Sequence, residues 1–123
     1  MVKLVFVARR KPGMSNEDFR KYWIERHAPL VRSLQDTIRV RKYVQSHTLD
    51  TEMNATFSEA RGMVPDEPAD GIAEAWWDSV EDMQAAFSEP EGMKAGQLLI
   101  EDESKFVDFA TSRAFLTTEQ TII

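Results

Sequence analysis

The chain has 123 residues and a formal net charge of −6, and 42% of its residues are apolar or aromatic. These values predict one domain, residues 1–123, with a hydrophobic core, and they argue against disorder. The acidic balance argues against nucleic-acid binding, and the absence of cysteine excludes disulfide and thiol chemistry. Because no apolar run suits a signal peptide or a membrane span, we expect a cytoplasmic protein without membrane contact.

The N-terminal third predicts a strand followed by a helix. Residues 2–9 are rich in β-branched side chains, and Lys11-Pro12-Gly13 is typical of a turn. Ser15 is expected to cap a helix that runs to about Ala28. Pro29 lacks an N–H and its ring crowds the preceding turn, so the helix is expected to kink or end there and a short segment to follow, to about residue 33.

The rest of the chain predicts three more strands and a second helical region. In order, the expected elements are a strand over 38–49, a polar stretch over 50–70, a strand over 71–78, a helix from the Ser79 cap to about 87, a helical piece over 90–100, a solvated acidic run at 101–103 and a strand over 112–122. A polar stretch of about twenty residues is either a lid or a disordered loop.

The resulting order, βαββαβ, favours an α+β ferredoxin-like fold, in which a four-stranded antiparallel sheet carries both helices on one face. Side chains alternate along a strand, so the adjacent Trp76 and Trp77 must point to opposite faces. Large apolar groups therefore lie on both faces of the sheet. We expect a second protomer to cover the face without helices, giving a homodimer packed sheet to sheet.

His27 is the first candidate for chemistry. Steps of three and four residues from Phe19 reach Trp23, His27 and Leu30, so an imidazole interrupts an apolar helical stripe. Burial would lower its pKa, whereas the carbonyl end of a helix would raise it. One interpretation is a core histidine bonded to a backbone carbonyl, and the other is a general acid or base.

His47 is the second candidate, on the strand face that also carries Tyr43 and Gln45. It is either a surface histidine at a strand end or the partner of His27 in a proton-transfer site. Two histidines are too few for a typical metal site unless carboxylates such as Glu74 and Asp78 complete it, so we expect no metal. The five glycines form no nucleotide-binding fingerprint, and we expect no organic cofactor.

Several segments together resemble the EthD family. They are Lys11-Pro12-Gly13-Met14-Ser15, Phe19, Tyr22-Trp23, His27-Ala28-Pro29-Leu30, Tyr43-Val44-Gln45-Ser46-His47, Asp70-Gly71-Ile72-Ala73-Glu74 with Trp76, Ser88-Glu89-Pro90-Glu91-Gly92 and Ala114-Phe115-Leu116. The resemblance implies a dimeric α+β barrel, a cavity without an organic cofactor, and proton transfer by side chains at His27 and His47. Some relatives carry another histidine in the last strand, where this chain has Glu119-Gln120.

Our leading hypothesis is a cofactor-independent enzyme for dehydration, isomerisation or a related lyase step on a small cyclic or aromatic metabolite. His27 would be the principal general base or acid and His47 its counterpart, and Tyr43 would donate a hydrogen bond to a developing oxyanion. Trp23, Trp76, Phe115 and Glu74 would shape the substrate pocket. The alternatives are an oxidoreductase, either a cofactor-free monooxygenase or an accessory to one, and a non-catalytic small-molecule binding protein.

Overall fold

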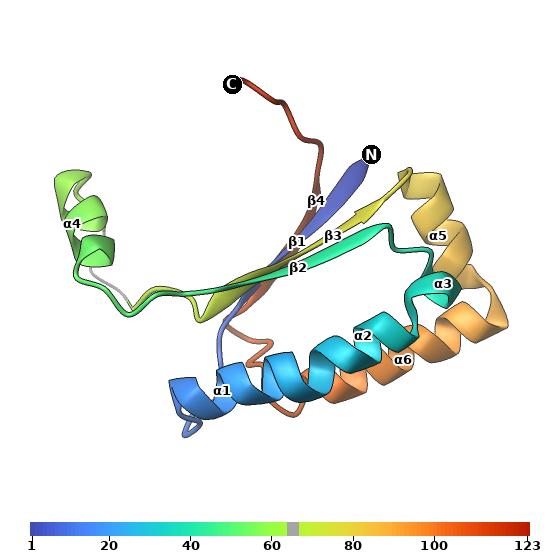
Figure 1. Cartoon of the computed structure of the whole chain (residues 1–123), viewed down its shortest axis with the longest axis horizontal. Helices are drawn as coiled ribbons and strands as arrows, with labels where there is room; N and C mark the ends of the chain where they lie inside the picture. The colour runs from blue at the N-terminus through green and yellow to red at the C-terminus, as the bar shows by residue number, and fades with distance from the viewer. Residues whose placement is uncertain (64–66) are drawn as a thin grey trace.

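The structure, a computed structural model, describes residues 1–63 and 67–123. A four-stranded sheet lies across the molecule, with the strands in the order β2-β3-β1-β4 (Figure 1). Each neighbouring pair is antiparallel. The strands are β1 (Val2–Ala8), β2 (Lys42–His47), β3 (Gly71–Trp77) and β4 (Arg113–Thr117). The predicted ferredoxin-like α+β fold is confirmed.

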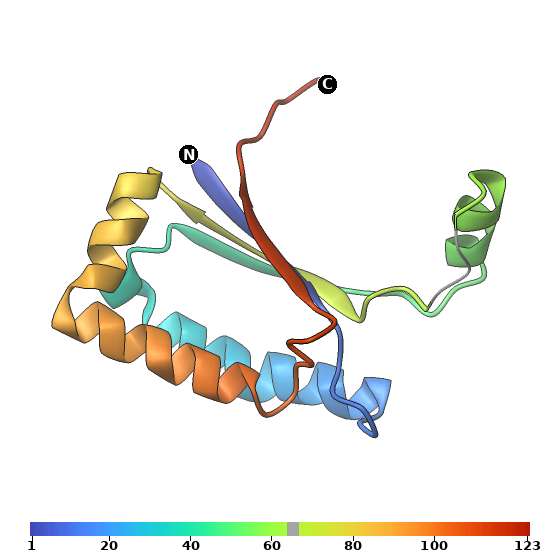
Figure 2. The same ribbon diagram turned by 180° about the vertical axis from the view of Figure 1, so that it is seen from behind.

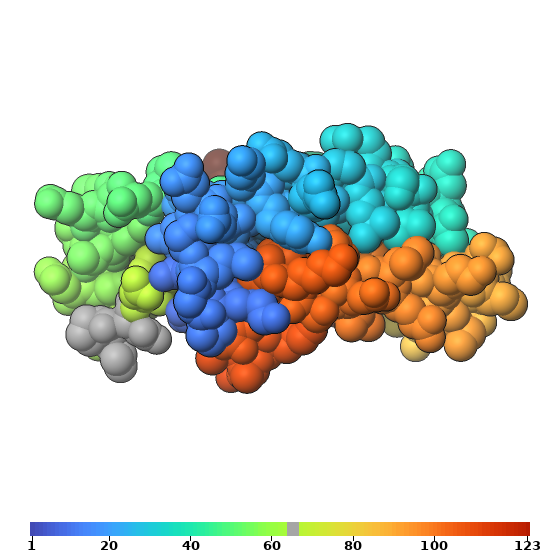
Figure 3. Space-filling model, turned by 90° about the horizontal axis from the view of Figure 1, so that it is seen from below, coloured from blue at the N-terminus to red at the C-terminus, as the bar shows by residue number. Residues whose placement is uncertain are grey.

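The helices, with one exception, lie on one side of this sheet (Figures 1 and 2). They are α1 (Asn16–Tyr22), the π-helical turn η1 (Trp23–His27), α2 (Ala28–Ser33), α3 (Gln35–Ile38), α5 (Val80–Ser88) and α6 (Pro90–Glu103). Seen from the helical side, α1 and α2 lie beside α6 and close this face of the molecule (Figure 3). No helix in the described part of the chain is both long and apolar enough to cross a membrane.

Two serines start the main helices as predicted. The Ser15 hydroxyl accepts from the Asp18 N–H at 3.1 Å, and the Ser79 hydroxyl accepts from the Asp82 N–H at 3.0 Å. Each bond satisfies one N–H that the first helical turn leaves without an intrahelical partner. Acidic residues in both first turns complement the helix dipole.

The first helix continues past Pro29 by widening one turn before it. The Ala28 N–H bonds to the Trp23 carbonyl, five residues back, and residues 27 and 28 keep helical backbone angles. In a regular α-helix the Pro29 ring would meet the carbonyl of Glu25. The wider turn accommodates the ring, so the expected kink or end takes the form of a π-turn, and His27 is its last residue.

Three predicted boundaries were wrong. Ile38 belongs to α3 rather than to a strand, and Arg39, at φ 61°, ends that helix in a left-handed conformation. The last strand stops at Thr117, well before residue 122. The third difference matters most for the site, because α6 runs to Glu103 and includes the acidic residues expected on a solvated surface.

The segment 50–70 contains a helix, α4 (Met53–Ala60), where a loop was expected. It stands apart from the other helices, beyond the ends of β2 and β3 (Figure 1), and none of its residues is buried. Met53 and Phe57 are each more than half exposed. Residues 64–66 of the expected lid or disordered loop lie outside the described residues, and a lid function stays a prediction.

The register between β1 and β3 decides which side chains reach the helices. Val2 pairs with Trp77, and Lys3 pairs with Trp76. Trp77 is buried on the helix-covered face, where its indole N–H donates to the Ile38 carbonyl at 2.7 Å. Trp76 lies on the opposite face, which carries no helix layer (Figure 1). The two tryptophans therefore occupy opposite faces, as alternation predicts.

Candidate active site

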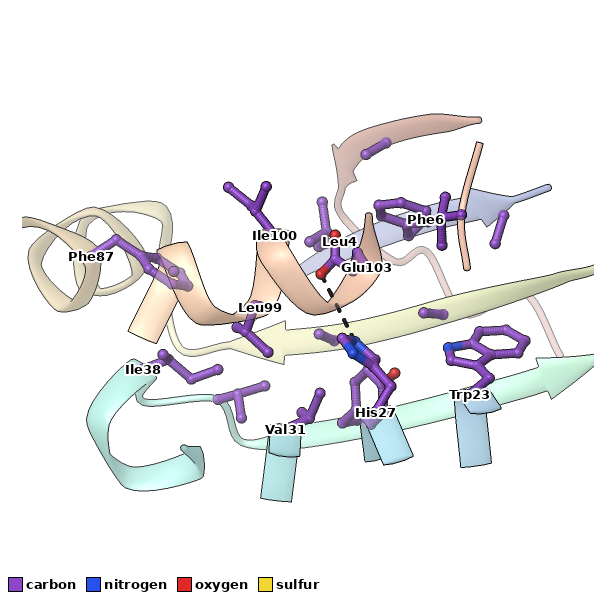
Figure 4. Close-up of a pocket in the computed structure, with 18 of the residues that line it drawn as sticks. Leu4, Phe6, Trp23, His27, Val31, Ile38, Phe87, Leu99, Ile100 and Glu103 are labelled. Atoms are coloured by element: carbon purple, nitrogen blue, oxygen red, sulfur yellow. Dashed lines mark ion pairs between the residues drawn. The ribbon is translucent and has the colours of Figure 1, made fainter. Parts of the chain in front are cut away.

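A cavity of about 340 Å³ lies between the inner face of the sheet and the helices. Its walls are mostly apolar, with Leu4, Phe6, Val31, Phe87 and Leu99 among them (Figure 4). Among the described residues that line it, ionisable side chains come from His27, Tyr43 and Glu103. A few polar groups converging in an apolar cavity are the usual form of a small-molecule site.

His27 is held by a carboxylate behind it and faces a second carboxyl. Its side chain is only 5% exposed, and its Nδ1 lies 2.7 Å from Oδ2 of Asp102. Its Nε2 lies 3.9 Å from Oε2 of Glu103, across a corner of the cavity (Figure 4). Burial lowers the pKa of His27, and the Asp102 charge opposes this only in part. The ring is therefore neutral at pH 7, with its proton on Nδ1 toward Asp102 and a free lone pair on Nε2.

Asp102 is shared between His27 and a tyrosine. The Tyr22 hydroxyl donates to its Oδ1 at 2.6 Å. Burial would raise the pKa of Asp102, but the hydrogen bonds from Tyr22 and His27 outweigh it, so the pKa is lowered. Burial and the hydrogen bond to Asp102 raise the pKa of Tyr22 to about 12. Asp102 thus stays ionised and fixes the orientation of the imidazole.

Glu103 titrates close to neutral pH. Burial raises its pKa to about 7, and the neighbouring Asp102 charge adds to this effect. The carboxyl is thus present in both protonation states near pH 7. A neutral imidazole and a carboxyl with a raised pKa, side by side in an apolar cavity, have the properties of a base and an acid.

A third ionisable side chain, that of Tyr43, reaches the cavity from β2. Tyr43 lines the cavity, and its hydroxyl oxygen accepts from the Gln45 amide at 3.2 Å. Burial raises the pKa of Tyr43, so this phenol stays protonated at neutral pH. His47 lies one step further out, with Nε2 2.9 Å from Oε1 of Gln45 and its ring packed on Trp23 at 4.6 Å between centroids.

The structure brings some of the predicted residues together and separates others. His27, Tyr43 and Trp23 line the cavity, whereas His47 is connected to it only through Gln45. Burial, followed by the Arg20 charge, lowers the pKa of His47. His47 therefore does not share the cavity with His27, because its ring lies against the outer side of Trp23 rather than inside the apolar space.

The other three predicted pocket residues lie on the opposite face of the sheet. Trp76 pairs with Lys3, and Glu74 and Phe115 both pair with Val5, all on the face away from the cavity. Glu74 bonds to Lys3 at 2.8 Å there, and Phe115 is half exposed. The sequence pattern placed large side chains on both faces correctly, but the register decides which ones point to the helices.

The sequence predicted that Asp102 and Glu103 lie on a solvated surface, after a helix that ends at Ile100. Acidic side chains in the last turn of a helix oppose the helix dipole, and this favours a helix end before them. One signal was available: Leu99 and Glu103 are four residues apart, which places them on the same face of a helix, and Phe106 follows three residues later. That spacing continues the apolar stripe of α6 through Glu103. A carboxyl on such a stripe is the counterpart of His27 on the first helix.

No three histidine, aspartate or glutamate side chains gather as a metal-binding group within residues 1–63 and 67–123. The two carboxylates considered as additional ligands are engaged elsewhere. Glu74 pairs with Lys3, and Asp78 pairs with Arg41 at 2.7 Å.

Fold and site together define an α+β protein of the ferredoxin-like class with an apolar cavity under the sheet. The model of the EthD domain matches residues 11–110, so the chain belongs to the EthD family. No curated protein matches the chain in sequence.

Solved structures share the whole fold at low identity. An EthD family protein from Bacillus halodurans superimposes with a TM-score of 0.64 at 21% identity, covering 98% of this chain and 99% of that one. An EthD-like protein from Ralstonia eutropha gives 0.60 at 16% identity, with 94% and 88% covered. A dimeric protein of ferredoxin-like fold from Bacteroides fragilis gives 0.56 at 14% identity, with 94% and 93% covered.

Proposed function

We propose that this protein is a cofactor-independent enzyme for proton transfer on a small, largely apolar cyclic or aromatic metabolite, catalysing dehydration, isomerisation or a related lyase step. One observation carries the proposal. A neutral imidazole, oriented by Asp102, faces a carboxyl of raised pKa at 3.9 Å inside an apolar cavity. This pair supplies a base and an acid at the same pH.

His27 is the general base in this proposal. Its Nδ1–H is committed to Asp102, so Nε2 accepts a proton from a carbon next to a carbonyl. The electron pair of that C–H bond forms a double bond as the neighbouring C–O bond breaks. The Asp102 carboxylate stabilises the imidazolium that results.

Glu103 is the general acid in this proposal, in place of His47, which was first expected to be the counterpart of His27. Its protonated form gives a proton to the departing hydroxyl, which leaves as water. In an isomerisation Glu103 gives its own proton to another carbon, and His27 then passes the proton that it removed to the Glu103 carboxylate, which restores both groups. The reaction needs His27 neutral and Glu103 protonated. The rate is therefore expected to rise with pH as His27 loses its proton, and to fall above about pH 7 as Glu103 loses its own.

We also propose that the protein works as a homodimer packed sheet to sheet. The face away from the helices carries Val5, Ile72, Trp76 and Phe115, and Ile72 and Phe115 are exposed. Covering these groups with a second copy would remove apolar surface from water. The dimeric neighbour from Bacteroides fragilis, of the same fold, is in keeping with this assembly.

Hydrogen–deuterium exchange tests the proposal without an identified substrate. 2-Tetralone in D₂O has acidic protons beside a carbonyl, and NMR measures their exchange. We expect the protein to accelerate the exchange and His27→Gln to slow it by about 100-fold or more. Gln97→Glu, a charge change at an exposed position of α6, is the control and should leave the rate unaltered.

The outcomes separate the alternatives. Equal exchange by wild type and His27→Gln would contradict the proposed base. Oxygen uptake with an anthrone substrate would instead indicate the cofactor-free monooxygenase, and tight stoichiometric binding without exchange would indicate a binding protein.

A further inference from the structure

The network behind Tyr43 has a direction that follows from the donors and acceptors in it. The Gln45 Nε2 donates to the Trp23 carbonyl at 3.0 Å and to the Tyr43 hydroxyl oxygen at 3.2 Å. Its Oε1 lies 2.9 Å from Nε2 of His47. A carbonyl can only accept, so turning the amide around would place two acceptors face to face at Trp23. The Trp23 carbonyl thus fixes the amide orientation.

His47 fixes the same orientation from the other end. Because Oε1 of Gln45 only accepts, the His47 Nε2 must carry the proton, in either the neutral or the charged ring. The ring itself is held against Trp23. The Gln45 side chain is therefore clamped on both sides, and both hydrogens of its amide nitrogen are assigned.

We propose that Gln45 is a positioning residue that makes Tyr43 a hydrogen-bond donor to the cavity, and that the site selects ligands carrying a carbonyl or enolate oxygen. With its oxygen accepting from Gln45, the Tyr43 hydroxyl directs its own proton away from Gln45. The open direction is the cavity that Tyr43 lines. His47 and Trp23 then act on the ligand through Gln45, although His47 does not line the cavity.

This selectivity follows from what the cavity otherwise offers. The walls of the cavity are mostly apolar. The Tyr43 hydroxyl proton is therefore an unsatisfied hydrogen-bond donor whenever it points into the cavity and meets no acceptor. A ligand oxygen satisfies it, and a hydrocarbon of the same shape does not. A carbonyl held by Tyr43 also acidifies the C–H bond next to it, which is the bond that His27 attacks in the proposed function. The inference rests on that function for this last step only.

A matched pair of ligands tests the inference by binding alone. 2-Acetylnaphthalene and 2-isopropenylnaphthalene have nearly the same shape, and only the first has an acceptor oxygen. Calorimetry or fluorescence titration gives both dissociation constants. We expect wild type to prefer the ketone, and this preference to fall by about fivefold to tenfold in Tyr43→Phe, the ordinary worth of one hydrogen bond.

Gln45→Glu is the decisive variant because it keeps the shape and reverses the hydrogen bond. A carboxylate only accepts, so the Tyr43 hydroxyl turns toward residue 45 and the ketone preference is lost although Tyr43 is intact. Gln45→Met, neutral and of similar length, should reduce the preference to an intermediate value. Gln97→Glu adds the same charge on the exposed side of α6 and should keep the wild-type preference.

Infrared spectroscopy covers the case in which Gln45→Glu fails to fold. The carbonyl stretch of bound 2-acetylnaphthalene should lie lower in wild type than in Tyr43→Phe. An unchanged stretch, or an unchanged ketone preference in Tyr43→Phe, would overturn the inference. A full preference in folded Gln45→Glu would overturn the role of Gln45. Since no turnover is measured, these results stand apart from the exchange experiment that tests the proposed function.

Discussion

On the outer face of the sheet, carboxylates lie beside cations. Glu74 contacts Lys3 at 2.8 Å, and the Trp76 N–H, together with the Lys3 charge, lowers the pKa of Glu119. On the helix-covered side, Asp102 and Glu103 are neighbours in sequence, and burial raises the pKa of Glu103 to about 7. The carboxylates of the outer face lie beside a cation and in contact with water, whereas Asp102 and Glu103 are two neighbouring carboxyls whose negative charges repel each other. A carboxylate is therefore structural on one face and a titrating group on the other because of its surroundings, not its type.

The two adjacent tryptophans give the largest expected contrast between the faces. Trp77→Ala should lower the free energy of unfolding by about 3–5 kcal/mol, because it removes a buried ring and its hydrogen bond to Ile38. Trp76→Ala should cost less in the monomer, because Lys3 and Lys42 rather than the hydrophobic core cover this buried ring, and it should also weaken self-association. Urea unfolding at several protein concentrations, with analytical ultracentrifugation, separates the two effects. Equal, concentration-independent losses would remove the distinction between the faces.

Glu103→Gln should show its effect as a change with pH. The folded-state pKa of about 7 lies above the ordinary value of 4.5, so the folded state binds more protons between these values. The stability that protonated Glu103 contributes is complete below pH 4.5 and is lost as the pH rises to about 7. Because the variant lacks this loss, its free energy of unfolding relative to wild type should rise by on the order of 3 kcal/mol between pH 4.5 and pH 7. Urea unfolding at pH 4.5 and pH 8 measures it, and a pH-independent difference would contradict the raised pKa.

Asp102→Asn should cost about 2 kcal/mol, the usual worth of hydrogen bonds to a charged group, because the bonds from Tyr22 and His27 lose their ionised acceptor. The Asp102 charge raises the pKa values of both His27 and Glu103, so both should fall in the variant. NMR titration of the imidazole and carboxyl signals checks this. Asp36→Asn, at an exposed site, is the control. An unmoved His27 titration would show that Asp102 does not act on the ring.

Lys3→Met should have the smallest effect. It removes the cation beside Glu74 and Glu119 on the outer face, where water replaces the lost contact. We expect the urea midpoint to shift much less than in Asp102→Asn. A shift as large as that one would mean that the outer charges are as strongly coupled as the inner ones.

The sequence predicted what local chemistry decides. Ser15 and Ser79 were identified as helix caps from their position before acidic residues, and alternation placed Trp76 and Trp77 on opposite faces. The sequence did not predict which of the two tryptophans faces the helices, because only the pairing of β1 with β3 determines this.

The candidate site was only half predictable for a related reason. His27 stood out as a polar group on an apolar stripe, and the structure places it in the cavity. Asp102 and Glu103 sit at a helix end where acids are locally unfavourable, and the residues that hold Asp102 there are Tyr22 and His27, far away in sequence. Local rules cannot include a partner that only the tertiary fold supplies.

The π-turn before Pro29 has a consequence for sequence change in this family. It contains one residue more than the α-helical turn that it replaces, between Trp23 and His27. Losing one residue there would remove the wide turn and bring the Pro29 ring against the carbonyl four residues before it. Keeping every residue but straightening the turn into an α-helix would instead place Tyr22 and His27, five residues apart, about 140° from each other around the axis, so that both could no longer bond to Asp102. The spacing of this segment, as much as the identity of its side chains, maintains the site.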